Sequence, residues 1–164
     1  MLQTLILASG LAAAVVIDVR TRRIPNWLTA SLAAAGLGMA FAGGGVSPRQ
    51  AALGLIAGLL LMMPSHLIGA TGAGDVKLMA AVGSLLGPGL VLRAFLFTAV
   101  AGGVLALAVA ARRGRLADTL HGTAQLVTAR ADGRQTIEAP HRANRFAYGP
   151  AIAIGTLVSM MVTS

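Results

Sequence analysis

The sequence predicts an all-α polytopic membrane protein, built as one bundle of six transmembrane helices. Hydrophobic residues make up 56% of the 164 residues and charged residues only 11%, whereas soluble domains are about 45–50% apolar and about 25% charged. The apolar residues form runs long enough to cross a bilayer, separated by short polar turns. Basic residues gather in alternate turns, as they do in membrane proteins of fixed orientation. We expect a single membrane domain over residues 1–164.

The same composition excludes several classes of protein. The chain has no cysteine, which rules out a disulfide framework, a Cys-ligated zinc module and a Cys nucleophile. Of the three histidines, His66 lies in an apolar run, and His121 and His141 have no carboxylate at a ligand spacing, so we expect no metal and no cofactor. The net charge of +8 comes from arginines between apolar runs without interleaved aromatics, which argues against nucleic acid as a partner.

The expected spans are the apolar runs bounded by glycine, proline or charged residues. They cover residues 2–17, 27–42, 50–68, 76–87, 90–111 and 148–162. The first run has no Lys or Arg before it and further spans follow, so we expect a retained helix and not a cleaved signal peptide. The run 76–87 is short for a span, but it can cross if it lies inside the bundle.

Several helix boundaries and contacts follow from glycine and proline. The charged stretch from Asp18 to Asn26 reads as a turn, after which Pro25 can begin the second helix. Pro64 lies near the end of the third span and can kink it. Two G-x-x-x-G pairs, Gly54 with Gly58 and Gly83 with Gly87, allow close helix packing. We expect this packing within one chain, with dimerisation as the weaker alternative.

Charge predicts the orientation. With the N-terminus outside, the inner segments hold 11 of the 13 basic residues: three in 18–26, one in 69–77 and seven in 112–145. The positive-inside rule favours this arrangement and makes 112–145 a cytoplasmic basic loop. Leucine, valine and alanine recur in that loop at three- to four-residue spacing, which suits a helix lying in the interface. A disordered cytoplasmic loop is the equal alternative.

Two acidic residues then fall at the same, cytoplasmic, membrane boundary. Asp18 follows the first span, and Asp75 lies in the glycine-rich stretch from Gly69 to Leu78, while the other acidic residues lie in the basic loop. Two neighbouring carboxylates do not both ionise easily, and one protonated and one ionised aspartate can activate water against a peptide carbonyl. The alternatives remain open: Asp75 could cap a helix or pair with Lys77, and Asp18 could pair with an arginine at 20, 22 or 23.

The motifs around these aspartates resemble one family. The stretch from Gly72 to Gly87, G-A-G-D-V-K-L-M-A-A-V-G-S-L-L-G, resembles the G-x-G-D-x-K-L signature of type IV prepilin peptidases, a class of membrane aspartyl proteases. The stretch from Asp18 to Leu28 resembles that family's first aspartate motif, an acid followed by arginine and then Ile-Pro-Asn. The stretch from Phe146 to Gly155, F-A-Y-G-P-A-I-A-I-G, is similar to the family's last helix, which commonly opens with an aromatic-x-x-Pro pattern.

The resemblance implies a function and a set of site residues. Asp18 and Asp75 would be the catalytic pair of an endopeptidase that removes the leader of prepilins at the cytoplasmic face of the bacterial inner membrane. The partners would be prepilins, membrane lipid and possible pilus assembly machinery. The chain lacks the N-terminal extension and cysteines of longer members, which indicates the short, peptidase-only kind that accompanies tight-adherence (Flp) pili and argues against N-methyltransferase activity. The supporting motif residues would be Gly72, Gly74, Lys77, Arg20, Pro25 and Asn26.

Within that motif, Gly72 and Gly74 would form a flexible turn that positions Asp75. Asn26 is expected to cap or orient the turn after Asp18, and Lys77 to hold a lipid phosphate or a substrate acid or to extend to the interface. His66 is expected to be a hydrogen-bonded structural histidine. The alternative functions are a non-catalytic pilus-assembly component and a small proton-coupled carrier that uses both aspartates. A carrier more usually places its carboxylates near mid-membrane, which favours the enzyme.

Overall fold

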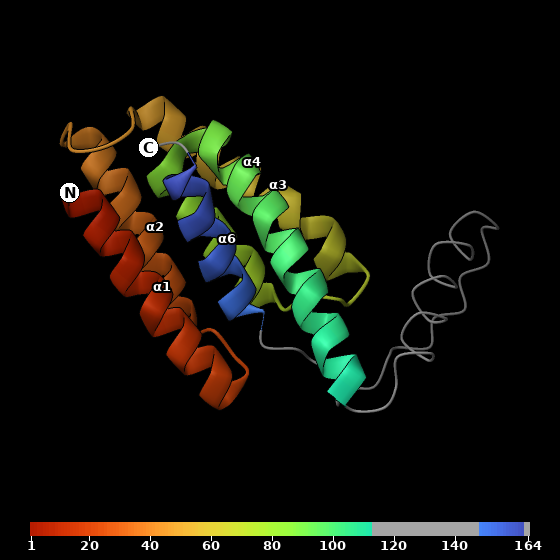
Figure 1. The fold of residues 1–164 in the computed structure, drawn as a ribbon. Coiled ribbons are helices and arrows are strands. Elements are labelled where there is room, and N and C mark those ends of the chain that lie inside the picture. The colour runs from red at the N-terminus through yellow and green to blue at the C-terminus, as the bar shows by residue number, and fades with distance from the viewer. Residues whose placement is uncertain (113–147, 163–164) are drawn as a thin grey trace.

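A computed structural model describes residues 1–112 and 148–162, with side chains up to residue 108 and from residue 148. All regular structure in these ranges is helical, which confirms the all-α class (Figure 1). The helices are α1 (Leu2–Thr21), α2 (Asn26–Phe41), α3 (Pro48–Leu67), α4 (Ala73–Arg112) and α6 (Gly149–Met161). Nearly all of the basic loop 112–145 lies outside the described residues, and so do His121 and His141.

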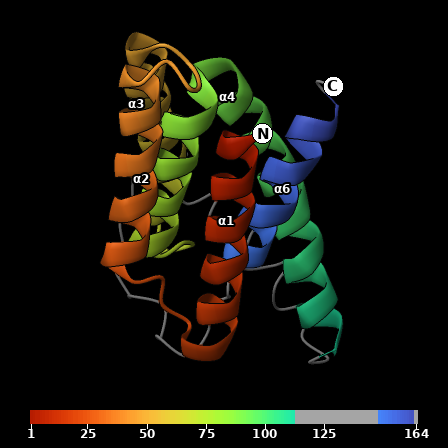
Figure 2. The same cartoon turned by 90° about the vertical axis from the view of Figure 1, so that its left-hand side faces the viewer.

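The described residues form five helices where the sequence predicted six, because two expected spans are joined in α4. The chain leaves helical geometry at one residue, Gly87, which has φ 78° and ψ 174°. Pro88 follows, and proline is well suited to a first helical turn because its missing N–H has no partner there. The helix therefore resumes without a loop. Figure 2 shows the two arms of α4 on either side of Gly87 running in opposite directions, the second beside α6.

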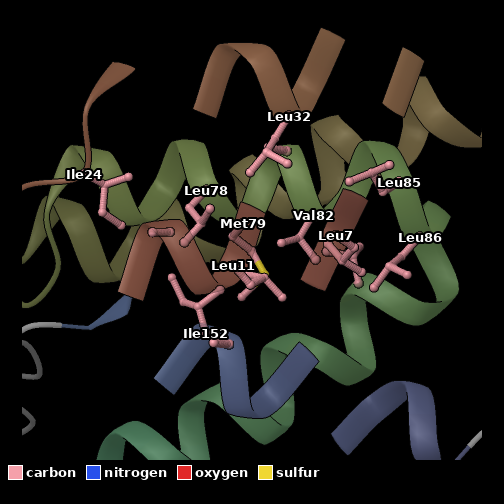
Figure 3. Packing of buried hydrophobic residues seen from close by; sticks show 14 of the residues in the cluster. Leu7, Leu11, Ile24, Leu32, Leu78, Met79, Val82, Leu85, Leu86 and Ile152 are labelled. Carbon is pink, nitrogen blue, oxygen red and sulfur yellow. The ribbon is translucent and has the colours of Figure 1, made fainter. Parts of the chain in front are cut away.

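The first arm of α4, residues 73–86, is the centre of the bundle. Every residue from Leu78 to Gly87 is buried, as expected for a helix that is apolar on all sides. It packs closely against α2 at Gly36 and against α3 at Gly54 and Gly58, and Figure 3 shows side chains of α1, α2 and α6 meeting it around Met79 and Val82. At about 1.5 Å per residue this arm is about 21 Å long. A helix this short crosses hydrocarbon only when other helices surround it.

Glycines bring α3 and the first arm of α4 into backbone contact. A β-carbon added to Gly54 would lie 2.0 Å from the Gly83 carbonyl oxygen, and one added to Gly58 would lie 2.3 Å from the Met79 carbonyl oxygen. The predicted close packing within one chain is confirmed at Gly54, Gly58 and Gly83. Gly87 has a different role from the one expected, since it makes the turn between the arms of α4.

The outer surface of the bundle is apolar, as for a protein surrounded by lipid. On the second arm of α4, five exposed apolar side chains follow one face at three- to four-residue spacing: Leu92, Leu96, Val100, Val104 and Leu107. Three helices, α1, α3 and α4, are long and apolar enough to cross a membrane. The chain is therefore a multi-pass membrane protein. The candidate span in α4 runs from Ala73 to Ala108 and contains the break at Gly87.

The ends of the helices place several sequence motifs together. The N-terminus and the C-terminal end of α6 lie at one end of the bundle, and the end of α1 and the starts of α4 and α6 lie at the other (Figures 1 and 2). The predicted turn from Asp18 to Asn26 is shorter than expected, because α1 continues through Asp18 to Thr21 and α2 already begins at Asn26. Pro64 lies inside α3, three residues before its end.

Candidate active site

Asp18 lies in the last turn of α1 and is buried, with 4% of its surface exposed. The helix ends because Arg22 takes a left-handed conformation, φ 52° and ψ 33°, and its N–H donates to the Asp18 carbonyl oxygen at 2.7 Å. This is a usual way to end a helix, although glycine more often takes that position. The Asp18 carboxylate accepts a hydrogen bond from the Gly149 N–H at 2.8 Å. The interaction joins residues 131 positions apart in the chain.

Gly149 is the first residue of α6, where backbone N–H groups have no partner within the helix. The N-terminal end of a helix carries a partial positive charge, so it suits a carboxylate. A β-carbon at Gly149 would lie 2.8 Å from Asp18 Oδ2, which is closer than real contacts allow. Glycine is therefore the residue that lets Asp18 approach this helix end.

Asp75 lies in the first turn of α4 and is also buried, with 6% exposed. Its Oδ2 accepts from the Gly72 N–H at 2.8 Å, while its own N–H donates to the Gly72 carbonyl oxygen at 3.1 Å. The side chain thus caps the start of α4, which is one of the alternatives that the sequence left open for Asp75. This position also favours the ionised carboxylate, because the positive end of the helix dipole lies beside it.

Both aspartates line one cavity of about 500 Å³. Its remaining walls come from the turn between α1 and α2 and from the turn that leads into α4. They consist of Thr21, Arg22, Arg23, Ile24, Ala70, Gly72, Ala73 and Gly74. The structure therefore brings together the two carboxylates that the sequence placed at one membrane boundary.

Tyr148 is a neighbour of this site that the sequence did not single out. Its ring packs over Gly102, where an added β-carbon would lie 2.5 Å from the hydroxyl oxygen. Tyr148 directly precedes Gly149, whose N–H donates to Asp18, and its hydroxyl can act as a hydrogen-bond donor. The aromatic residue before Gly-Pro was the only signal for it in the sequence.

Lys77 and Asn26 contact each other at the edge of the site. Lys77 Nζ donates to Asn26 Oδ1 at 2.9 Å, which joins the second turn of α4 to the first turn of α2. Asn26 does not cap α2, since this helix begins after Pro25, which takes an extended conformation, and no side chain caps it. Its expected role in orienting the turn after Asp18 stays a prediction. Arg20 is exposed in the last turn of α1, where a cation complements the helix dipole.

The glycine turn differs from the prediction. Gly74 is helical and lies against Ile24. A β-carbon added to Gly74 would lie 3.0 Å from the Ile24 β-carbon, so the small size of Gly74 allows the two segments to pack closely. Gly69 is the residue of this turn with a positive φ, 75°. His66 is hydrogen-bonded as expected, with Nδ1 3.1 Å from the Thr71 carbonyl oxygen. The buried Thr71 hydroxyl has no hydrogen-bond partner within the described ranges.

Comparison with known proteins gives one family. The model of the type IV leader peptidase family matches residues 5–107, a range that contains both aspartates and ends before α6. No curated protein and no solved structure matches the chain significantly. The family match covers more than half of the sequence and includes both motifs that form the cavity. The chain belongs to the type IV leader peptidase family.

Proposed function

We propose that this protein is an aspartic endopeptidase that removes the leader peptide of type IV prepilins, with Asp18 and Asp75 as its catalytic pair. One observation supports this most directly: two buried carboxylates from separate helices line a single cavity in a member of the type IV leader peptidase family. Burial makes both charges costly to hold, so one shared proton is favoured over two ionised groups.

The helix ends suggest how the pair divides its work. Asp75 lies in the first turn of α4, which favours its ionised form, whereas Asp18 lies in the last turn of α1, which favours its protonated form. The Gly149 N–H at the start of α6 then stabilises the negative charge that Asp18 gains when it gives up its proton. Asp75 would then take a proton from water as the water oxygen attacks the scissile carbonyl carbon. Asp18 would donate its proton to the carbonyl oxygen. The C–N bond breaks when the amide nitrogen gains a proton from the pair.

We further propose six membrane crossings within a single domain 1–164, with the two arms of α4 counted separately. Both termini would lie outside and the cavity at the cytoplasmic face of the bacterial inner membrane. The charge distribution supports this, since 11 of 13 basic residues then lie inside. A reporter fused within 112–145 should be cytoplasmic. A periplasmic signal from that segment would reverse the orientation.

We infer the substrate from the family of the protein and from the position of the cavity at the membrane boundary. A prepilin would present the junction between a basic leader and an apolar helix, at the depth of the cavity. Helical peptide bonds are shielded by their own hydrogen bonds, so a small residue before the cut would ease local unwinding. We expect one cut after a small residue, unaffected by chelators. The absence of cysteine supports the Flp-associated kind without N-methyltransferase activity.

The deciding experiment incubates the purified protein with a candidate Flp-type prepilin and maps the new N-terminus by mass spectrometry. Asp18→Asn and Asp75→Asn should each remove almost all cleavage, and the double variant should be scarcely worse, because groups that act as a unit are not additive. Asp118→Asn makes the same chemical change outside the family match and should cleave normally. Near-normal turnover by either single variant would refute the catalytic pair.

A further inference from the structure

One peptide group connects His66 to Asp75. His66 lies near the end of α3, and its Nδ1 is 3.1 Å from the Thr71 carbonyl oxygen. A carbonyl oxygen only accepts hydrogen bonds, so Nδ1 carries the proton in this contact. The N–H of Gly72 belongs to the same peptide group as the Thr71 carbonyl, and it donates to Asp75 Oδ2 at 2.8 Å. The order of groups is imidazole, peptide, carboxylate.

We propose that His66 is a positioning residue for Asp75 and acts through the Thr71–Gly72 peptide. The inference rests on the proposed function, because it assigns His66 a part in the work of the catalytic pair. A donor on the carbonyl oxygen polarises the peptide and makes its N–H a better donor, by about 10–30% per bond in a chain of hydrogen bonds. It also fixes the peptide plane, so that the N–H stays directed at Oδ2.

In the turn between α3 and α4, the hydrogen bond from His66 is what orients the Thr71–Gly72 peptide. The turn between α3 and α4 begins at the exposed residues Ile68 and Gly69, and the Ala70 and Thr71 N–H groups are held by the Ser65 carbonyl oxygen at 3.0 and 3.3 Å. Those bonds hold the peptides before Thr71, but they do not orient the Thr71–Gly72 peptide. Its carbonyl oxygen therefore needs a hydrogen-bond donor of its own. The Thr71 hydroxyl has no partner in the described residues, so its side chain does not supply that orientation. The imidazole of His66 does.

Other charged and titratable groups lie near Asp75. Asp18, Arg22 and Arg23 line the same cavity, Tyr148 directly precedes the donor to Asp18, and Lys77 on the next turn of α4 donates to Asn26. Each of these stays unchanged in a substitution at His66. A change in the behaviour of Asp75 in such a variant therefore reports on the peptide connection.

The link between His66 and the Gly72 amide can be measured directly by NMR, because the sequence allows this amide to be labelled selectively. Thr71–Gly72 is the only Thr-Gly pair in the chain, so labelling threonine with ¹³C at its carbonyl and glycine with ¹⁵N selects one amide signal by NMR. His66→Leu removes the donor, and His66→Asn, which has nearly the shape of leucine, returns an N–H close to the Nδ1 position. We expect the Gly72 amide proton to move upfield in His66→Leu and in Asp75→Asn, and to recover in His66→Asn.

Kinetics provide the second arm. His66→Leu should lower kcat for prepilin cleavage by about two- to fivefold with little change in KM. It should also move the acid limb of the pH profile to higher pH, because a carboxylate with a weaker hydrogen bond gains a proton more readily. His66→Asn should restore most of both. Leu67→Ala, an exposed neighbour on α3, is the control for general effects on this helix end. If His66→Leu does not fold, His66→Gln, whose amide extends beyond Nδ1, replaces it.

The two arms separate the possible failures. A Gly72 signal that moves in Asp75→Asn but not in His66→Leu would overturn the inference. A Gly72 signal that moves while kcat and the pH profile stay the same would also overturn it, and would leave the proposed function intact. If the wild-type protein does not cleave prepilins, the proposed function fails, and the NMR comparison still shows whether His66 acts on the Gly72 amide.

Discussion

The substitution Gly149→Ala tests the contact between α6 and Asp18. The added β-carbon would lie 2.8 Å from Asp18 Oδ2, 3.2 Å from Asp18 Cβ and 3.3 Å from Asp18 Cγ. Ordinary contacts begin at 3.4 Å, so the carboxylate must retreat by about 0.6 Å. The hydrogen bond from the Gly149 N–H, now 2.8 Å long, would then exceed the range of good N–H···O geometry.

The expected loss follows from that bond. Asp18 becomes negatively charged as it donates its proton to the substrate, and a hydrogen bond to a charged group contributes about 1.5–3 kcal/mol. About 1.4 kcal/mol corresponds to a factor of ten in rate. We expect kcat/KM for prepilin cleavage to fall roughly 10- to 100-fold. Stability should change much less, because alanine favours a helix over glycine by about 1 kcal/mol and offsets part of the lost contact.

The assay measures cleavage rate and thermal unfolding in detergent on the same preparations. Gly103→Ala is the matched control, since no described atom lies within 4 Å of its added β-carbon. It should cleave normally and unfold at a slightly higher temperature. Wild-type cleavage by Gly149→Ala would refute the conclusion that Asp18 depends on this hydrogen bond. An equal loss of stability and of rate would make Gly149 a packing residue only.

Three further substitutions test the fold around the site. Gly54→Leu should lower the free energy of unfolding by about 3 kcal/mol or more, because its β-carbon would lie 2.0 Å from the Gly83 carbonyl oxygen; thermal unfolding in detergent measures this. Lys77→Met removes the exposed hydrogen bond to Asn26 and should cost about 1 kcal/mol or less, with cleavage falling less than tenfold. Gly74→Val should lower stability and cleavage together, and a selective loss of cleavage in a fully stable protein would contradict its packing role.

The helices were largely predictable because lipid imposes a strong pattern on sequence. Long apolar runs separated by polar turns gave the all-α class and the positions of most helices. The continuation of α1 through Asp18 was not predictable, because a charged residue after an apolar run usually marks its end. Asp18 stays in the helix since its carboxylate reaches a donor on α6, at a residue that no local pattern connects to it.

The two aspartates were predicted and a helix cap by Asp75 was one of the stated alternatives, but the contact of Asp18 with α6 was not predicted. Their donors are backbone N–H groups of Gly149 and Gly72, and a backbone group has no sequence signal of its own. The contact of Asn26 with Lys77 was not predicted for a related reason. An asparagine just before a helix often caps it, but α2 begins at Asn26 itself, one residue earlier than expected, and the amide oxygen accepts from Lys77.

The position of α6 determines whether Asp18 has its donor, and two close contacts set that position. Tyr148 packs over Gly102 on the second arm of α4, and Gly155 lies against the backbone of the same arm, where an added β-carbon would be 2.4 Å from an amide nitrogen. The contacts lie about two turns apart on α6, so sliding the helix along α4 would break both. The fixed register holds the Gly149 N–H at Asp18. The second arm of α4 thus contributes to the site by fixing the height of α6 in the bundle.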